Sequence, residues 1–583
     1  MPLPTLEDSC RRFLDWCAPL LSAEELAATE AEVADFLRSG GPGRVLHSAL
    51  EEYDAAEGTH SWLDDFWAFR YLGRRDRIAL NANFFFLFRD CRLPQVERAA
   101  GLIAGAVRHK QRVDRELPAD VQRGRPQSTV QHRFLFSSTR IPGTVQDTAR
   151  TPWSPEHPGP SEARHVVVFH RGHAFRLDVI GEDGVPYGPG DLEDGLRGVL
   201  DAAREPAAPD SRVGHLTTMA RAEWADAREA LLAAGPRNAA ALEEIETALF
   251  CVALEDFAPA DVKEACDELL CGDRGNRWFD KALTLVVFGD GRAGVNVEHC
   301  KLDGTTVLRF TDALLGSTSE EHSRRSGART RGAPAPERIE FELTGELRAQ
   351  VRAAAEAFAA YGADTATETV SFDDFGADTA KHLGFSPDAF VQCAYQLAHQ
   401  RAKGHLGATY ESIATRQYRY GRTEAMRVIT PEMREFVAAM EDPAAGADAR
   451  RAAFRAAAAR HVARAKECQT GQAPEQHLWE LELIQRRRGE ELGVVEQPGL
   501  YRTPGWLTMR DDYLSTSSAP SANIQFFGFG STSSRCIGVA YVLLPERFHL
   551  YLSTPRTVAG QMRTFAARLR EAVGELRELA AGE

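Results

Sequence analysis

The sequence has few cysteines, and they follow no pattern that would build a covalent frame or hold a metal ion. Ten cysteines are scattered through 583 residues without a CxxC pair. In a chain of this length, such a distribution is typical of reduced thiols and not of disulfides or a zinc site. We therefore expect no bound metal and a reducing compartment.

Long apolar runs and targeting signals are also missing. No stretch of the sequence approaches the roughly 18 apolar residues that span a bilayer. The N-terminus, MPLPTLEDSC, lacks the basic-then-apolar order of a signal peptide. The C-terminus, ELAAGE, carries no SKL-type address. The sequence predicts a cytoplasmic protein without a membrane span.

Positive charge is in deficit as well. Lysine and arginine number 69 against 84 aspartates and glutamates, for a net charge of −15. Because a general nucleic-acid binder needs a basic face, we expect no nucleic-acid partner. A local basic pocket for an anionic small molecule remains compatible with this total. A Walker-type loop, a GxGxxG after a strand and an HExxH helix are all missing.

What is present is an ordinary globular composition in a long chain. Apolar residues make up 43% and charged residues 26%, which excludes a mainly disordered protein. A chain of 583 residues exceeds a single hydrophobic core, so we expect two domains or two fused halves. Predicted helices and strands alternate in both halves, which indicates α/β layers.

The apolar periodicity locates several elements. Helical spacing predicts helices over 24–38, 345–361, 387–404 and 443–466. Runs rich in β-branched and aromatic residues predict hairpins over 165–180 and 283–296, and strands near 524–528 and 536–552. The segment 316–336 is poor in apolar residues and rich in Gly, Ser, Arg and Pro. We expect it to form an exposed linker between the two halves.

One histidine directly follows a predicted strand and precedes an Asp-Gly pair. In residues 298–304 (EHCKLDG), His299 falls on a turn and Asp303 lies four residues further on. The carboxylate would fix the ring or its loop, and Gly304 permits a tight backbone. A general base that acts on a hydroxyl needs this arrangement. Taken alone the pattern is more often a surface turn, so both interpretations stay open.

Two further polar segments are equally ambiguous. The hydroxyls of Ser515, Thr516 and Ser517 either satisfy backbone groups in a turn or include a donor to an oxyanion. Residues 409–424 concentrate polar and aromatic side chains in the motifs TYES and GRTE. They belong either to a salt-bridged surface or to a binding site. The aromatic run at 84–88 is better explained as core than as a cofactor site.

Taken in order, these segments resemble the choline/carnitine acyltransferase family over almost the full length of the chain. The likeness begins at LPTL (3–6) and rests on several separate motifs. They are WAFRYL (67–72), STRIPG (138–143), LTT (216–218), NRWFDK (276–281), the HxxxDG run at 299–304, SPDAF (386–390), TYES (409–412), GRTE (421–424) and LSTS (514–517).

The resemblance implies a fold and a division of the chain. We expect an α/β fold of two related, chloramphenicol-acetyltransferase-like α/β domains with an active-site tunnel at their interface. A discontinuous domain of residues 1–55 and 343–583 would bind the acceptor and CoA. A domain of residues 56–342 would carry the catalytic histidine. We also expect a monomer.

The resemblance also implies direct transfer within a ternary complex. Acyl-CoA would be the co-substrate, and no cofactor would be bound permanently. His299 would take the proton from the acceptor hydroxyl, Ser517 would hold the oxyanion, and Asp303 would support His299 or its loop. Lys381 and Asp388 would bind CoA.

An acceptor pocket is implied at positions where family members contact carnitine. These positions are Tyr71, Tyr410, Ser412, Thr423, Ser515 and Phe529. The arginine that meets the carnitine carboxylate in the family is Gln476 here, and a neutral amide is a poor replacement for a guanidinium. Arg70 stands where family members carry a small or apolar residue. It either supplies the missing positive charge or is a solvated helix residue.

The acyl chain length is implied by Phe527. Long-chain members leave this pocket position as glycine, whereas short-chain members fill it with a bulky side chain. We therefore expect transfer of an acetyl or similar short acyl group to carnitine or a related quaternary ammonium alcohol. The alternatives are an O-acyltransferase for choline or a specialised metabolite, and a non-catalytic acyl-CoA-binding relative.

Overall fold

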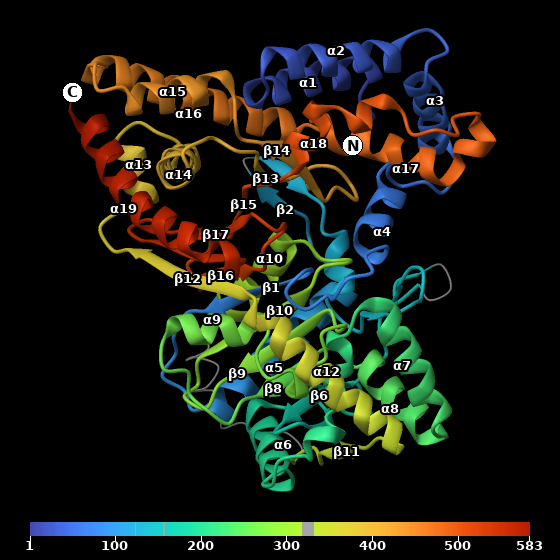
Figure 1. Cartoon of the computed structure of the whole chain (residues 1–583). Helices are drawn as coiled ribbons and strands as arrows, with labels where there is room; N and C mark the ends of the chain where they lie inside the picture. Colours follow the sequence, from blue (N-terminus) through green and yellow to red (C-terminus); the bar gives the residue numbers. More distant parts are fainter. Residues whose placement is uncertain (123, 155–157, 317–331, 583) are drawn as a thin grey trace.

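Two β-sheets organise the chain. The computed structural model describes residues 1–122, 124–154, 158–316 and 332–582. One sheet lies in the lower half of Figure 1, and the other lies in the upper half beneath a layer of helices. Both termini lie in the upper half, so the chain starts there, builds the lower half and returns.

The lower sheet has eight strands in the order β11-β7-β6-β8-β9-β10-β1-β16. The strands are β1 (Asn83–Phe88), β6 (His165–His170), β7 (His173–Asp178), β8 (Cys251–Leu254), β9 (Leu283–Val287), β10 (Ala293–Glu298), β11 (Glu337–Ile339) and β16 (Ile524–Phe529). Left-handed backbone at Arg171 and Gly172 turns the β6–β7 hairpin, and Gly291 does so before β10. The two predicted hairpins are confirmed.

Strand β1 explains why the lower sheet is buried on both faces. Successive side chains of a strand point to opposite faces, so Phe84 and Phe86 enter one core while Phe85 and Leu87 enter the other. Each fully buried phenylalanine stabilises the fold by about 1.5–3 kcal/mol.

Helices cover both faces of the lower sheet. The core that contains Phe84 and Phe86 is covered by α5 (Gln95–Asp114), α6 (Pro189–Ala202) and α10 (Gly304–Gly316). The core that contains Phe85 and Leu87 is covered by α7 (Arg221–Ala233), α8 (Pro236–Thr247), α9 (Val262–Leu270) and α12 (Gly345–Ala363).

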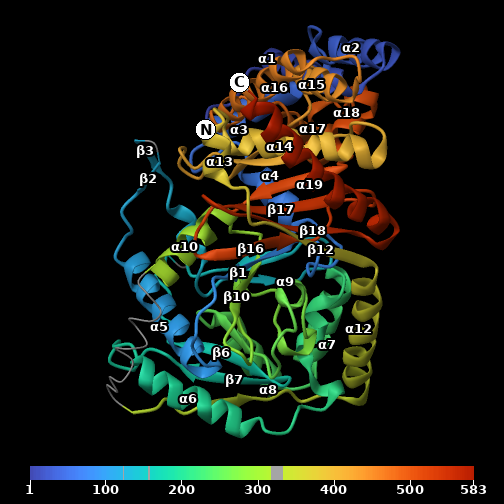
Figure 2. The ribbon, with the colours of Figure 1, turned by 90° about the vertical axis from the view of Figure 1, so that its left-hand side faces the viewer.

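The upper sheet has six strands in the order β12-β18-β17-β15-β13-β14. The strands are β12 (Thr365–Phe372), β13 (Thr409–Ala414), β14 (Thr423–Arg427), β15 (Leu514–Ser518), β17 (Ile537–Leu543) and β18 (Phe548–Pro555). Helices α14 (Pro387–Lys403) and α19 (Ala559–Ala581) cover this sheet in Figure 2. The other upper helices are α1 (Leu6–Cys17), α2 (Ala23–Leu37), α3 (Pro42–Ala55), α4 (Asp64–Leu72), α13 (Ala377–His382), α15 (Pro431–Glu441), α16 (Ala447–Gln469), α17 (Glu475–Leu492) and α18 (Pro504–Arg510).

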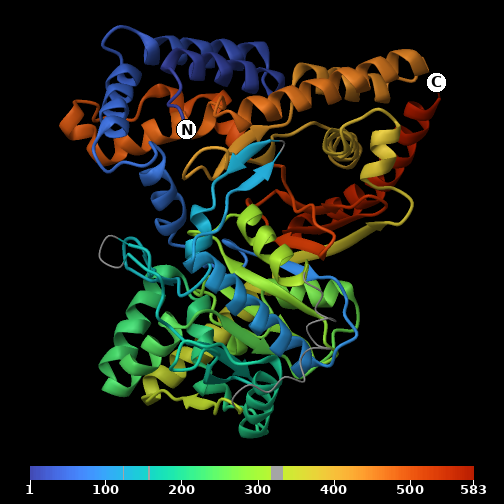
Figure 3. The ribbon, with the colours of Figure 1, turned by 180° about the vertical axis from the view of Figure 1, so that it is seen from behind.

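Two elements cross between the halves. Strand β16 comes from the C-terminal part of the chain but completes the lower sheet, where Phe527 pairs with Phe86 and Phe529 with Phe84. In the opposite direction, the hairpin β2 (Asp120–Gln122) and β3 (Arg125–Gln127) rises from the lower half towards β13 and β14 in Figure 3. The Asp120 carboxylate there lies 3.2 Å from the guanidinium of Arg416. The halves are therefore joined by a sheet and by an ion pair.

The predicted α/β class is confirmed, and most predicted elements are present. One predicted boundary is wrong: the helix expected over 443–466 begins only at Ala447, after the loop that follows α15. Most of the predicted linker, residues 317–331, lies outside the described residues. The domain division at residue 55 stays a prediction, and Phe66 and Trp67 of α4 pack in the same core as the first helices.

Among the described residues, no helix combines the length and the apolar character needed to cross a bilayer. None of the ten cysteines, all of which lie in the described residues, forms a disulfide bond.

The join between the two sheets is expected to be sensitive to a single methyl group. A Cβ on Gly528 would lie 2.3 Å from the Phe85 ring and 2.5 Å from the Tyr551 ring. Overpacking of this kind costs about 1–3 kcal/mol, so Gly528→Ala should lower the thermal unfolding midpoint. Gly345→Ala is the matched control, since nothing lies within 4 Å of its added Cβ. Equal midpoints for the two variants would contradict the tight packing at β16.

Candidate active site

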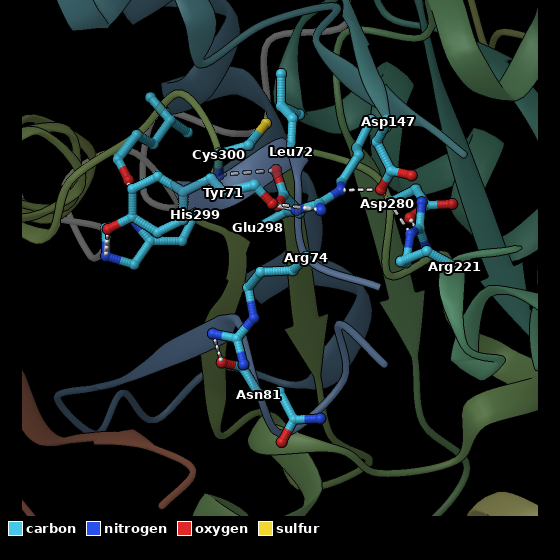
Figure 4. A network of polar contacts seen from close by, with 12 residues as sticks. Tyr71, Leu72, Arg74, Asn81, Asp147, Arg221, Asp280, Glu298, His299 and Cys300 are labelled. Carbon is cyan, nitrogen blue, oxygen red and sulfur yellow. Dashed lines mark hydrogen bonds and ion pairs between the residues drawn. The ribbon is translucent and has the colours of Figure 1, made fainter. Parts of the chain in front are cut away.

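His299 leaves the lower sheet directly after β10, where the two halves meet. The register that pairs Phe84 of β1 with Phe529 of β16 brings a strand of the C-terminal part beside it. The ring centroid of His299 lies 4.8 Å from that of Tyr71 and 5.2 Å from that of Phe84. Figure 4 shows the Tyr71 ring against the imidazole. The strand followed by a histidine turn, predicted from the sequence, is present.

The imidazole has one defined tautomer. Its Nδ1 lies 2.6 Å from the carbonyl oxygen of Leu302. Because a carbonyl only accepts hydrogen bonds, Nδ1 must carry the proton. Nε2 is then left with a lone pair, and the nearest hydroxyl is that of Tyr71 at 3.4 Å. Burial raises the pKa of Tyr71 to about 12, so its phenol stays neutral beside the ring. A fixed ring whose second nitrogen carries a lone pair and makes only this long contact can act as a general base.

Asp303 holds the loop and does not bond the ring directly. Its nearest oxygen is 3.7 Å from Nδ1 of His299. The carboxylate instead accepts hydrogen bonds from Arg422 at 2.8 Å and from Gln131 at 2.6 Å. The sequence predicted that Asp303 supports either the His299 ring or its loop. The direct contacts of the carboxylate favour support of the loop. Removing one partner from a buried ion pair of this kind costs about 3–5 kcal/mol.

Arg422 connects this loop to the upper sheet. It directly precedes β14, and its guanidinium also donates to the carbonyl oxygens of Cys300 at 2.8 Å and His299 at 3.2 Å. One side chain from the upper half thus binds three groups of the histidine loop. The side chain of Arg422 is 10% exposed and that of Asp303 is 2% exposed, so water screens the pair little.

Opposing effects set the protonation of the site. Burial lowers the pKa of His299 below its ordinary value of 6.5, with Arg422 acting in the same direction and Asp303 against it. Burial would raise the pKa of Asp303, but Arg422 outweighs burial and the pKa falls below its usual value. At neutral pH the site therefore holds a neutral imidazole beside an ionised carboxylate.

A buried arginine fixes both sides of the histidine. Arg140 donates to the carbonyl oxygen of Tyr71 at 2.5 Å and lies 3.1 Å from the carboxylate of Glu298. The other oxygen of Glu298 accepts from the backbone N–H of Cys300 at 3.0 Å. Arg140 thereby links the helix that carries Tyr71 to the strand end that carries His299.

A chain of buried charges continues behind this arginine. Asp147 accepts from Arg140 at 2.5 Å and from Arg221 at 2.7 Å, and Arg221 reaches Asp280 at 2.8 Å. Figure 4 shows Asp147, Arg221 and Asp280 in sequence away from the histidine. All four side chains are at most 1% exposed. Buried charges of this kind persist only when they are paired, so the chain forms a rigid support.

The predicted acceptor residues lie mainly on two neighbouring strands. Tyr410 and Ser412 share one face of β13, because side chains two residues apart point the same way. Both are half-buried, as is Thr423 at the start of β14. Gln476, at the start of α17, is fully buried, and its Nε2 donates to the carbonyl oxygen of Thr423 at 3.0 Å. The Oε1 atom of Gln476 has no hydrogen-bond partner among the described residues.

The hydroxyl run lies on β15 and does not form a turn. Ser515 and Ser517 share one face of the strand, and Thr516 points to the other. The Thr516 hydroxyl donates to the carbonyl oxygen of Tyr410 at 2.9 Å. Ser515 is buried and Ser517 is half-buried. The turn interpretation is therefore wrong, because the hydroxyls belong to a strand beside β13.

Phe527 lies in a cage of aromatic rings next to the histidine. Its ring centroid is 5.5 Å from that of Phe86, 5.6 Å from that of Phe529 and 6.2 Å from that of Phe84. Phe84 in turn contacts His299. Phe527 is 6% exposed, whereas Phe529 is half-buried.

The predicted CoA residues occupy different environments. Lys381 on α13 is exposed and lies 2.9 Å from the Asp378 carboxylate. Asp388, in the first turn of α14, accepts from Tyr541 at 2.5 Å and lies 3.0 Å from Nε2 of His461. Together with Glu411, the residues Asp388 and His461 form the one group of possible metal ligands within the described residues. Burial and the neighbouring Asp388 raise the pKa of Glu411 well above its usual value, which favours the neutral carboxyl group over a carboxylate that would bind a cation.

A cavity of about 440 Å³ lies beside the histidine loop, between the two halves. Trp67 of α4, Gln131 of the lower half and Arg422 of the upper half line it, together with Cys300 and Lys301. The predicted tunnel stays a prediction, and this cavity lies at the boundary where it was expected.

Several site residues were not identified from the sequence. Gln131 and Arg140 contact the histidine loop from distant parts of the chain. The carbonyl of Leu302 contacts His299 within the loop, but it belongs to the backbone. Arg140 and Arg422 occur within conspicuous motifs, STRIPG and GRTE. An arginine within an otherwise apolar or hydroxyl-rich motif is a sequence signal for a buried ion pair, because a buried arginine requires a partner. This signal could have identified both residues.

The charge balance around His299 can be tested by a titration that follows the histidine NMR signals. Its pKa should lie below 6.5 in the wild type. Arg422→Gln removes a positive neighbour and should raise this pKa, whereas Asp303→Asn removes a negative neighbour and should lower it further. Arg419→Gln is the control arginine. A pKa that shifts the same way in both loop variants would contradict the assigned roles.

Comparison with known proteins shows which family the chain belongs to. Residues 1–571 match the family model described as choline/carnitine O-acyltransferase. The mitochondrial carnitine O-palmitoyltransferase 2 of Rattus norvegicus is 30% identical, over 93% of this chain and 86% of that protein. The peroxisomal carnitine O-octanoyltransferase of Homo sapiens is 31% identical, over 84% of this chain and 81% of that protein. Among solved structures, the first condensation domain of the CDA synthetase aligns with a TM-score of 0.36 at 13% identity, over 85% of this chain and 92% of that one. The chain belongs to the choline/carnitine O-acyltransferase family and is an acyltransferase.

Proposed function

We propose that the enzyme transfers a short acyl group from acyl-CoA to the hydroxyl of carnitine or a related quaternary ammonium alcohol, with His299 as general base. The observation that carries this proposal is the fixed tautomer of His299. Its Nδ1 is committed to the Leu302 carbonyl, which leaves the Nε2 lone pair for a substrate hydroxyl. Membership of the family supports acyl-CoA as co-substrate and a carnitine-type acceptor.

The proposed reaction is a single displacement. Nε2 of His299 removes the acceptor proton as the hydroxyl oxygen attacks the thioester carbonyl. The C–O bond forms, the C–S bond breaks, and the imidazolium returns its proton to the CoA thiolate. Base catalysis of this type is worth roughly 10²–10⁴ in rate. No acyl-enzyme is needed, because donor and acceptor react within one ternary complex.

Ser517 is the proposed donor to the tetrahedral oxyanion. It is half-buried on β15, on the same face as Ser515. A single donor to an oxyanion is worth about 10²–10³ in kcat. Lys381 and Asp388 are the proposed CoA contacts. The ion pair between Lys381 and Asp378 competes with a phosphate for the same ammonium group, so this contact would anchor CoA only weakly.

Quaternary ammonium recognition is proposed at Phe529. An aromatic face attracts a cation by about 0.5–2 kcal/mol, and Phe529 is half-buried at the end of β16. Tyr71, Tyr410, Ser412, Thr423 and Ser515 supply the hydroxyls of the proposed acceptor pocket. Choline or a specialised-metabolite alcohol is the alternative acceptor.

A non-catalytic acyl-CoA-binding protein is the alternative from another class. The support around His299 argues against it. A mere binder has no physical need for an imidazole in a fixed tautomer, a paired Asp303 and an arginine from the opposite half. We further propose a monomeric state and a cytoplasmic location, and the lack of disulfide bonds among the ten cysteines supports the location.

The proposed base can be tested by thiol release from acetyl-CoA in the presence of carnitine. His299→Ala should lower kcat by roughly 10²–10⁴, and Ser517→Ala by about 10²–10³, with KM for acetyl-CoA little changed. Arg338→Gln, at the far end of the lower sheet, should leave the rate unchanged. Wild-type rates in the His299 variant would exclude the proposed chemistry.

Acyl length is the second test of the proposal. Phe527 fills its cage of aromatic rings, so Phe527→Gly should open a space for longer chains. We expect the ratio of kcat/KM for octanoyl-CoA over acetyl-CoA to rise at least tenfold, since several methylenes become buried at about 0.8 kcal/mol each. Equal ratios in the variant and the wild type would refute Phe527 as the floor of the acyl pocket.

A further inference from the structure

Gln131 binds the histidine loop through both ends of its side-chain amide. Its Oε1 accepts hydrogen bonds from the backbone N–H of Asp303 and from the hydroxyl of Thr306, both at 2.9 Å. Its Nε2 donates to the Asp303 carboxylate at 2.6 Å. The orientation of the amide is defined, because a backbone N–H can only donate and must therefore face the amide oxygen.

The accepting end of this amide caps helix α10. The carbonyl oxygen of Asp303 accepts the first hydrogen bonds of the helix, from the N–H groups of Thr306 at 3.0 Å and Val307 at 3.3 Å. The N–H of a residue at a helix start has no partner within the helix. In a capping box, a Glu or Gln three residues later accepts from this N–H. That position is Thr306 here, and Gln131 accepts in its place from a distant part of the chain.

The donating end of the amide holds a carboxylate beside the catalytic ring. Oδ1 of Asp303 accepts from Arg422 at 2.8 Å, and Oδ2 accepts from Gln131. Oδ1 lies 3.7 Å from Nδ1 of His299, which is too far for a hydrogen bond. Nδ1 donates to the Leu302 carbonyl at 2.6 Å instead. A carboxylate that was free to turn would be the stronger acceptor, because charge-assisted hydrogen bonds are about twice as strong as neutral ones.

The glutamine is itself carried by a segment that is anchored in both halves. This segment is the short helix η2 (Val130–Phe134). On one side, the buried ring of His132 lies 3.3 Å from Nε2 of His109 on α5. On the other side, the carbonyl oxygen of Ser128 accepts from the guanidinium of Arg416, in the upper half, at 2.8 Å. Burial lowers the pKa of the two histidines to about 3 and about 4, so both rings are neutral at pH 7.

We propose that Gln131 is a positioning residue of the reaction, which holds the Asp303 carboxylate away from the His299 ring so that Nδ1 stays bonded to Leu302. This inference rests on the proposed role of His299 as general base and adds a residue that acts through Asp303. Loss of the amide would release Oδ2 and let the carboxylate turn towards Nδ1. A carboxylate at the ring would stabilise the imidazolium, and the base would then become protonated at a higher pH.

Other titratable or charged groups around the ring come from the neighbouring elements and stay unchanged in the test. They include Glu298 at the end of β10 and Arg422 before β14. Burial raises the pKa of Tyr71 on α4 to about 12 and that of Cys300 well above its usual value, so both groups are neutral. A change in the pKa of the histidine between the variants below therefore reports the position of the carboxylate.

Gln131→Met keeps the length of the side chain and removes all three hydrogen bonds. In an NMR titration it should raise the pKa of His299 by about one unit, at the lower end of the shift that an opposite charge within about 4–6 Å causes. In thiol release from acetyl-CoA with carnitine, kcat should fall roughly 10- to 100-fold, as expected for a misplaced reacting group. The loss should be larger at about pH 6 than at about pH 8, because more of the imidazole is then protonated. KM for both substrates should change little.

Gln95→Met is the matched control. Gln95 also donates two hydrogen bonds from its amide, to the carbonyl oxygens of Glu255 at 2.6 Å and Val287 at 2.9 Å. Val287 pairs with Ala293, at the far end of β10 from His299. This variant should change neither the pKa of His299 nor kcat.

A double variant separates positioning from a merely structural effect. With Asp303→Asn no carboxylate remains to be released, so adding Gln131→Met should no longer raise the pKa of His299. A rise of the same size in that background would show that lost packing admits water to the ring, and it would overturn the inference. Thr306→Val removes one hydrogen bond to the glutamine and should give a smaller rise, which decides the question if Gln131→Met does not fold. An unchanged pKa in the single variants would also overturn the inference.

The titration separates failure of this inference from failure of the proposed function, because it needs no turnover. If the pKa of His299 depends on Gln131 but thiol release survives His299→Ala, only the general base is refuted. If His299→Ala abolishes thiol release but the pKa is independent of Gln131, the base stands and the positioning role is refuted.

Discussion

The ion pair between Arg422 and Asp303 is the interaction on which the geometry of the active site depends. Asp303 belongs to the loop that follows a strand of the lower sheet, and Arg422 precedes a strand of the upper sheet. The same guanidinium binds the carbonyls of His299 and Cys300. Because the pair is almost free of solvent, the halves cannot separate there without exposing an unpaired charge. The contact that orients the loop therefore also joins the two halves.

The surroundings of His299 combine rigidity with a neutral imidazole. Arg140, Asp147 and Arg221 form a buried chain of alternating charge that holds the strand end from behind. The rings of Tyr71 and Phe84 lie against the imidazole, and its burial lowers its pKa. A neutral, immobile ring is what base catalysis near pH 7 requires.

Much of the fold could be predicted from local patterns. The two hairpins, the buried run at Phe84–Phe88 and helix α14 follow from period-two and period-3.6 burial, which short stretches of sequence display directly. The start of α16 was misplaced, because an alanine-rich run extends smoothly past the true boundary. The crossing of β16 into the lower sheet was not foreseen. Strand pairing at such a sequence distance leaves no local trace.

The sequence by itself determined the candidate base, since a histidine between a strand and an Asp-Gly turn is a local feature of residues 298–304. It also supplied Asp303, the hydroxyl run at Ser515–Ser517 and the family resemblance. Only the structure decided that the carbonyl of Leu302 fixes the tautomer and that Asp303 bonds Arg422 and not the ring. The first fact depends on how the backbone of the loop folds, and the second on which groups meet across two sheets. Distances between remote residues are set by packing and not by sequence spacing.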